Sequence, residues 1–154
     1  MRGLRERVDR LLERVLATLM ALMVINVCWQ VVTRFILRQP SSFTEEAARF
    51  LLIWVGLLGA SYALGQRMHL AIDVLARWKP SWRPGLRITS LAVTATFALL
   101  VLGVGGARLV LLTLELGQTS AALGWSLGYV YLALPLSGLL MTFYALSELS
   151  EPAQ

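Results

Sequence analysis

The sequence predicts an all-α integral membrane protein, with four transmembrane helices and amphipathic interfacial helices at the N-terminus and in the middle loop. Four long apolar runs carry this prediction, at about residues 15–36, 43–64, 86–116 and 125–146. Each run reaches the roughly 20 helical residues needed to cross a hydrocarbon core about 30 Å thick. Because backbone groups inside lipid must bond within their own segment, each run is expected to be a helix.

Composition supports a membrane protein and argues against other classes. Of the 154 residues, 57% are hydrophobic and only 15% are charged, whereas about 25% are charged in an ordinary soluble domain. The segments outside the runs are too short for a soluble catalytic domain, so we expect a single membrane domain over residues 1–154, with a cytoplasmic loop at about residues 65–85. The net charge of +5 comes from residues at helix ends, so no nucleic-acid partner is expected.

The positions of Lys and Arg predict the topology. The N-terminal stub and the middle loop with its edges hold most of these residues: Arg2, Arg5, Arg7, Arg10, Arg14, Arg67, Arg77, Lys79, Arg83 and Arg87. The first short turn has Arg38, and the second turn and the tail have none. Since positive residues favour the cytoplasm, both termini are expected there. The first apolar run is too long for a signal peptide, so we expect it to remain as an uncleaved span.

Two segments outside the apolar runs have the pattern of interfacial helices. Apolar residues recur at helical spacing in the stub: Leu4, Val8, Leu11, Leu12 and Val15. We expect this stub to lie on the inner membrane surface before it turns into the first span. Residues at about 68–78 in the middle loop place apolar side chains on one helical face and are expected to lie along the same surface. Membrane lipids are therefore expected partners of both segments.

Residues that could carry chemistry are few. His69 and Asp73 are four apart in the middle loop and could bind a metal or relay a proton, but two ligands are a weak metal signal, and a salt-bridged interfacial face is favoured. Cys28 is the single cysteine and cannot form an internal disulfide. The chain lacks a glycine-rich phosphate loop, an HExxH zinc motif and a GxSxG nucleophile motif. We therefore expect no enzyme activity and no cofactor.

Small residues mark candidate packing faces in the spans. The pairs four residues apart are Gly56 with Ala60, Gly59 with Ala63, and Gly103 with Ala107. Such faces let helices approach closely, either within this chain or against a foreign helix, and the sequence leaves both readings open. Pro135, followed by a serine and a glycine, predicts a kink in the fourth span.

Charged residues in or near the spans need partners, because unpaired charges in lipid are costly. Asn26, Gln30 and Arg34 form a polar stripe in the first span, and Glu45 and Glu46 open the second. A short turn joins these ends, so we expect Arg34 to pair with one of the two glutamates. An ion or proton path is the alternative reading of this cluster.

The third span carries Arg108 and, seven residues later, Glu115, which places both on one helical face. Glu115 is expected near the outer end of the span, with Arg108 deeper in the membrane. The deeper arginine needs a partner inside the chain or outside it.

The chain resembles the small membrane subunit of tripartite ATP-independent periplasmic (TRAP) transporters, the DctQ-like family, over nearly its whole length. The resemblance lies in "FTEEAARFLLIWVGLLGASYAL", in the spacing of the middle loop, and in "GQTSAALGWSLGYVYLALPLSGLLM". The most specific residues are Glu46 with Trp54 and Gly59, His69 with Asp73, and Gln118, Thr119 and Ser120 followed by Tyr131 and Pro135. The chain has Ala121 and Ser126 where the family often has prolines, which affects the expected shape of the second turn.

The resemblance implies a heteromeric secondary importer of organic acids in a bacterial or archaeal inner membrane. In such systems a periplasmic substrate-binding protein delivers the acid to a large membrane subunit, which moves it by an elevator-type motion, typically coupled to sodium. The small subunit binds the large one and enlarges its static scaffold. The resemblance therefore places no substrate, metal or sodium site in this chain.

Two other functions remain open from the residues alone. A self-sufficient small proton-coupled multidrug exporter would use Glu46 or Glu115 as its proton carrier and would need that acid to line a cavity in the membrane. A small integral-membrane enzyme would need a polar site near the cytoplasmic face, where His69, Asp73 and Arg77 are the candidates.

Overall fold

The computed structural model describes residues 2–39, 41–66 and 83–149 and confirms the predicted all-α class with four long apolar helices. Four helical segments in this part are long and apolar enough to cross a membrane: Gly3–Phe35, Ser42–Gly65, Ile88–Glu115 and Leu127–Leu149. The described elements are α1 (Arg2–Phe35), α2 (Ser42–Gly65), α4 (Arg83–Phe97), the π-helix η2 (Ala98–Gly105), α5 (Gly106–Glu115), α6 (Leu127–Tyr131) and α7 (Ala133–Leu149). The last three spans begin and end within a few residues of the predicted bounds.

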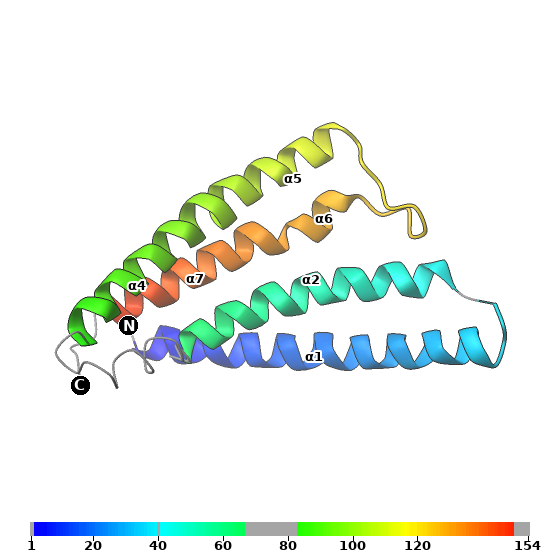
Figure 1. Ribbon diagram of the computed structural model, residues 1–154, viewed down its shortest axis with the longest axis horizontal. Helices are drawn as coiled ribbons and strands as arrows, with labels where there is room; N and C mark the ends of the chain where they lie inside the picture. The colour runs from blue at the N-terminus through cyan, green and yellow to red at the C-terminus, as the bar shows by residue number, and fades with distance from the viewer. Residues whose placement is uncertain (1, 40, 67–82, 150–154) are drawn as a thin grey trace.

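The spans form two antiparallel pairs that lie side by side (Figure 1). Helix α2 packs between α1 and α7, and α7 packs in turn on α4, η2 and α5 of the third span. We call the end where α1 begins and α2 and α7 finish the terminal end. The opposite end, with residues 36–41 and 116–126, is called the turn end. The two pairs are closer at the terminal end and diverge toward the turn end (Figure 1).

The N-terminal stub is not a separate interfacial helix. It continues straight into the first span as the single helix α1 of 34 residues, about 50 Å long at 1.5 Å per residue. The prediction that the stub turns before the span is therefore wrong. The reason is local, because no glycine or proline occurs between Leu4 and Phe35 to end the helix. The predicted helix at about residues 68–78 lies outside the described residues.

Helix α2 begins with a side-chain cap and ends in the interior of the bundle. The Ser41 hydroxyl accepts a hydrogen bond from the Thr44 N–H, which satisfies one of the free donors of the first turn. At the other end, Gly65 is buried against the Tyr144 ring, and a Cβ there would lie 2.6 Å from the Tyr144 Cε1 atom. Glycine is therefore needed where α2 meets α7 at the terminal end.

The third span contains a stretch of π-helix that fits against α7. A Cβ on Gly138 of α7 would lie 2.6 Å from the Gly103 backbone N and 2.7 Å from the Ala98 carbonyl O. The two backbones thus touch directly, and a side chain at position 138 would separate them. The π-helical turns of η2 lie in this contact region. Because Gly138 has no side chain, α7 leaves room for the π-helical backbone, which is wider than that of an α-helix.

The fourth span is broken, as Pro135 predicted. Helix α6 ends at Tyr131 and α7 begins at Ala133. Pro135 has no N–H to donate, and its ring would clash with the carbonyl of Tyr131, four residues earlier. This position coincides with the break.

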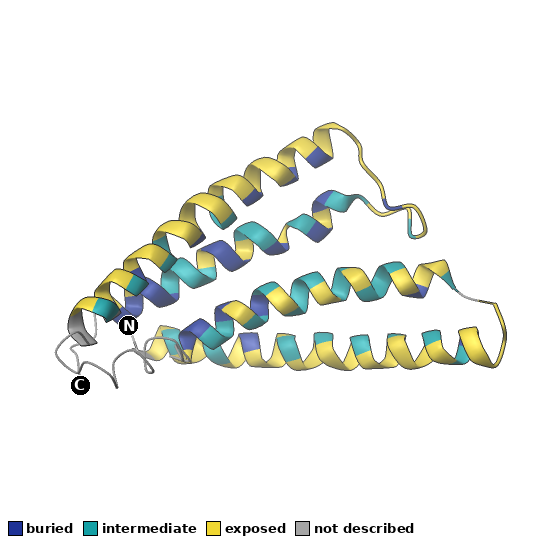
Figure 2. Cartoon of the chain, viewed as in Figure 1, coloured by how far each residue is buried: buried dark blue, intermediate teal, exposed yellow. Residues whose placement is uncertain are grey.

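Burial is concentrated on α7 and on the terminal end of the bundle (Figure 2). The core cluster there joins α1, α2 and α7 through Leu12, Leu58, Leu64 and Tyr144. Val8 packs against the same cluster, so the apolar stripe of the stub serves partly as core, whereas Leu4 and Leu11 stay exposed. Most other apolar side chains face outward, as expected where lipid is the solvent.

Candidate functional site

The turn between the third and fourth spans is compact despite lacking the expected prolines. Thr119 and Ser126 form an isolated antiparallel bridge, and the Ser120 N–H donates to the Trp125 carbonyl at 2.8 Å. Gly117 and Gly124 adopt positive φ angles of 60° and 68°, which glycine tolerates without strain. Left-handed glycines thus provide the reversal. Ser126 also caps α6 by accepting a hydrogen bond from the Gly128 N–H.

Glu46 of α2 binds this turn. Its Oε2 atom accepts hydrogen bonds from the Ser120 hydroxyl at 3.0 Å, the Ala122 N–H at 2.8 Å and the Leu123 N–H at 3.0 Å. Hydrogen bonds to an ionised carboxylate are stronger than those between neutral groups. One side chain therefore ties the start of the second span to the connection between the third and fourth. Glu46 was a candidate from sequence, but its partners lie more than 70 residues away and could not be foreseen.

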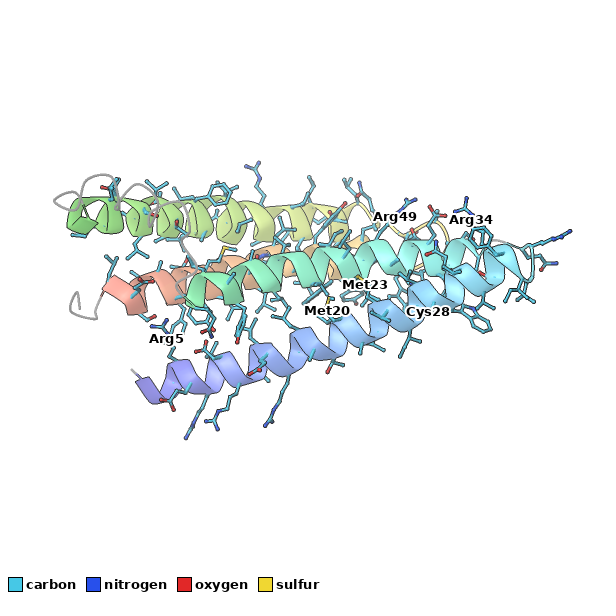
Figure 3. The ribbon with its side chains drawn as sticks, turned by 60° about the horizontal axis from the view of Figure 1, so that its bottom comes forward. Arg5, Met20, Met23, Cys28, Arg34 and Arg49 are labelled. Atoms are coloured by element: carbon cyan, nitrogen blue, oxygen red, sulfur yellow. The ribbon has the colours of Figure 1, made fainter. Side chains whose placement is uncertain are left out.

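The predicted ion pair of Arg34 is not formed within the described part of the chain. Glu45 pairs with Arg49 at 2.6 Å, one helical turn along α2, and Glu46 is engaged by the turn. In Figure 3, Arg34 and Arg49 both lie toward the turn end of the bundle, and Arg5 lies at the terminal end. Arg34 itself is exposed.

The polar link between the first two spans is made by Asn26, whose Nδ2 donates to the Thr44 carbonyl at 2.8 Å. Each four-residue step along a helix advances 400°, so the stripe from Asn26 to Arg34 rotates by about 80°. This rotation directs Asn26 toward α2 and leaves Arg34 outside. It is the physical reason why the Arg34 pairing is wrong.

The small-residue faces divide between internal packing and outward exposure. Gly59 lies against Leu16, because a Cβ built on it would be 4.0 Å from the Leu16 Cδ2 atom, and Gly103 lies against Gly138. Gly56 has no neighbour within 4 Å of a Cβ built on it, and both Ala60 and Ala107 are exposed.

The contact at Gly106, where a Cβ would be 2.7 Å from the Leu134 Cβ, was not singled out from sequence. The run of glycines at 103–106 was a signal for close packing. It could not indicate which of these glycines faces α7.

Arg108 and Glu115 are both exposed on α5. They are not joined to each other by an ion pair, since the described residues contain none at this face. The alternative of pairing within the chain is therefore not realised between these two residues. His69, Asp73 and Arg77 lie outside the described residues.

A second polar network holds the terminal end together, and sequence reasoning missed it. The Tyr144 hydroxyl donates to the Asp9 carboxylate, and Arg5 donates to the Gly65 carbonyl. The Arg5 guanidinium also lies 6.0 Å from the centre of the Tyr144 ring, within cation–π range. The four-residue spacing of Arg5 and Asp9, on the same face as Val8 and Leu12, was the signal that could have located it.

An open apolar groove of about 800 Å³ lies between α1, α2, α6 and the turn. Trp54, a candidate from sequence, lines it together with Trp29, Trp125 and Tyr129. Within the described ranges, no group of three His, Cys, Asp or Glu residues could hold a metal ion.

Comparison with known proteins decides the family. Residues 22–154 match the family of tripartite ATP-independent periplasmic transporters, DctQ component. The chain belongs to this family. DctQ proteins are subunits of TRAP transporters, so this chain is a TRAP small permease subunit and belongs to a heteromeric complex with other TRAP components.

Two similar proteins agree with the family match. A Haemophilus influenzae protein assigned as a TRAP transporter small permease protein is 28% identical over 151 residues, covering 97% of this chain and 91% of its own length. The sialic acid TRAP transporter small permease protein SiaQ of Vibrio cholerae is also 28% identical over 151 residues, covering 95% of this chain and 83% of its own length.

Several of the residues that carry the resemblance to the DctQ family lie at contacts between elements. Glu46 and Ser120 form the link between the second span and the turn. Gly59 lies at the contact of α2 with α1, and Pro135 follows the break between α6 and α7.

Proposed function

We propose that this DctQ subunit braces the static scaffold of a large elevator-type TRAP membrane subunit during import of organic acids. A periplasmic substrate-binding protein would deliver the acid, and a sodium gradient would drive the uptake. The large subunit, rather than this chain, would carry the substrate and sodium sites.

The observation that carries the proposal is a set of polar contacts that join the spans to one another. Glu46 binds the 116–126 turn, Asn26 binds the second span, and Ser61 donates from α2 to the Ser137 carbonyl at 3.3 Å. Transporters place their substrate sites near the midplane on discontinuous helices with convergent polar groups. The groove between α1, α2, α6 and the turn is instead open and apolar, which supports a bracing role.

The organic acid itself is proposed from similarity. The Vibrio cholerae relative is named for sialic acid, and this makes sialic acid the first substrate to test, followed by a panel of other carboxylic acids. An exporter that uses Glu46 as proton carrier is less well supported, because three donors already occupy one oxygen of that carboxylate.

Reconstitution tests the proposal. Liposomes containing the large subunit, loaded binding protein and a sodium gradient should take up acid only when this chain is present. Liposomes containing this chain alone should take up and release nothing. Full uptake without this chain would contradict the bracing role, and transport by this chain alone would favour the exporter.

A further inference from the structure

Arg108 is a charged side chain inside a membrane span, and none of the described residues neutralises it. It is exposed on α5 and makes no ion pair or side-chain hydrogen bond with the described residues. The opposite side of the same span is covered by α7, which contacts Gly103 and Gly106. Arg108 therefore points away from the bundle.

The depth of Arg108 makes this exposure costly. The span runs from Ile88 to Glu115, so Arg108 lies seven residues, or about 10 Å, inside its turn end and about 30 Å from its other end. An arginine near a helix end can extend its guanidinium to the lipid headgroups. From this depth an extended side chain falls short of the end of the helix, and an acidic partner would lower the cost of holding the charge at the edge of the apolar layer.

The surface around Arg108 has the character of a helix-docking face. Exposed apolar side chains flank it along the span, namely Val104, Leu111 and Leu112. Glu115 follows on the same face at the C-terminal end of α5 and is also exposed, where the helix dipole disfavours an acid. The face thus presents a cation and, about 10 Å further along, an anion, separated by leucines.

We propose that this face of α5 is the docking surface for the large TRAP membrane subunit, and that Arg108 pairs there with an acidic side chain on one of its membrane-spanning helices. The inference rests on the proposed function and specifies which face and which charge the partner uses. Charge complementarity selects the occupant: a helix with an acid opposite Arg108 removes the charge from lipid, whereas an uncharged helix would bury it unpaired. A basic or amide side chain of the same partner helix would lie opposite Glu115.

A neutral variant and a charge-retaining variant of Arg108 test the charge requirement. The large subunit is tagged, and capture of this chain is measured in nanodiscs over a range of concentrations. Arg108→Leu should weaken the complex at least tenfold, because the acid of the partner would be left unpaired in the interface. Arg108→Lys should retain most of the affinity. Arg34→Leu is the matched control, because it removes an exposed arginine at the turn end of α1, and it should bind like wild type.

A photo-crosslinking residue at Leu111 locates the partner. It should form an adduct with the large subunit, and the adducted peptide should place an acidic residue within one helical turn of the crosslink. Changing that acid to lysine should restore capture of an Arg108→Glu variant. Thermal unfolding of the isolated variants checks that each is folded, which is expected because Arg108 is exposed and makes no ion pair or hydrogen bond with the described residues.

The outcomes separate this inference from the proposed function. If the large subunit captures the Arg108→Leu variant as well as it captures the wild-type chain, the inference is overturned and the bracing role still stands. The same holds if a crosslinker at Leu111 labels only lipid. Failure of the wild-type chain to bind the large subunit at all would overturn both.

Discussion

Substituting Gly138 by alanine should destabilise the bundle at the contact between α7 and the third span. The added methyl group would lie 2.6 Å from the Gly103 N atom, 2.7 Å from the Ala98 O atom and 3.0 Å from the Leu102 carbonyl C atom. These distances fall up to about 0.8 Å short of the 3.4 Å at which ordinary van der Waals contact begins. All three atoms belong to the backbone of η2, so no side-chain rotation can relieve the overlap.

The size of the effect follows from two opposing terms. Overpacking of a well-packed interior costs about 1–3 kcal/mol, and a backbone clash belongs at the upper end of that range. Replacing glycine by alanine within a helix returns up to about 1 kcal/mol through helix propensity. We expect a net loss of about 2 kcal/mol in the free energy of unfolding, with α7 displaced from η2.

Reversible unfolding of the purified subunit in mixed micelles, titrated with a denaturing detergent, measures this difference. Gly56→Ala is the matched control, because a Cβ there meets nothing within 4 Å, and it should leave stability unchanged or slightly higher. If Gly138→Ala unfolds at the same detergent fraction as Gly56→Ala, the direct backbone contact between the two spans is refuted.

Three further predictions concern the two ends of the bundle and its orientation. Glu46→Ala should release the 116–126 turn and speed amide hydrogen exchange at residues 120–124. The control Glu45→Ala removes only an exposed ion pair and should not change this exchange. Equal exchange in the two variants would count against the contact between Glu46 and the turn. Tyr144→Phe removes the hydroxyl that donates to Asp9 and should lower the unfolding free energy by about 1 kcal/mol. The control Tyr129→Phe changes an exposed residue and should leave the unfolding free energy unchanged. A reporter that works only in the cytoplasm should be active when it is fused after the last residue. Activity of a reporter that works only in the periplasm would contradict the predicted topology.

Local composition predicted the spans well. Length and apolarity determine which segments cross a bilayer, because lipid imposes the same requirement on every helix. The break near Pro135 was predicted for a similar reason, since a missing N–H acts within one turn. The straight course of α1 was equally local, yet it was mispredicted, because the amphipathic pattern of residues 4–15 suits a membrane surface and a helix-packing face alike.

The residues of the candidate site were less predictable than their elements. Glu46 was recognised as a candidate, but the sequence could not reveal that a turn more than 70 residues away supplies its hydrogen-bond donors. Asn26 and Arg34 appeared as one polar stripe, and only the rotation of α1 against α2 decided that Asn26 makes the contact.

The sequence by itself predicted four membrane-spanning helices, because hydrophobic length and the distribution of charge are properties of each segment alone. The tertiary structure decided which faces of those spans meet. It placed Gly138 against η2, set Tyr144 and Asp9 together, and left Arg108 outside. Such choices depend on how each helix is rotated and shifted against its neighbours, and this rotation arises from packing between segments that are distant in the chain.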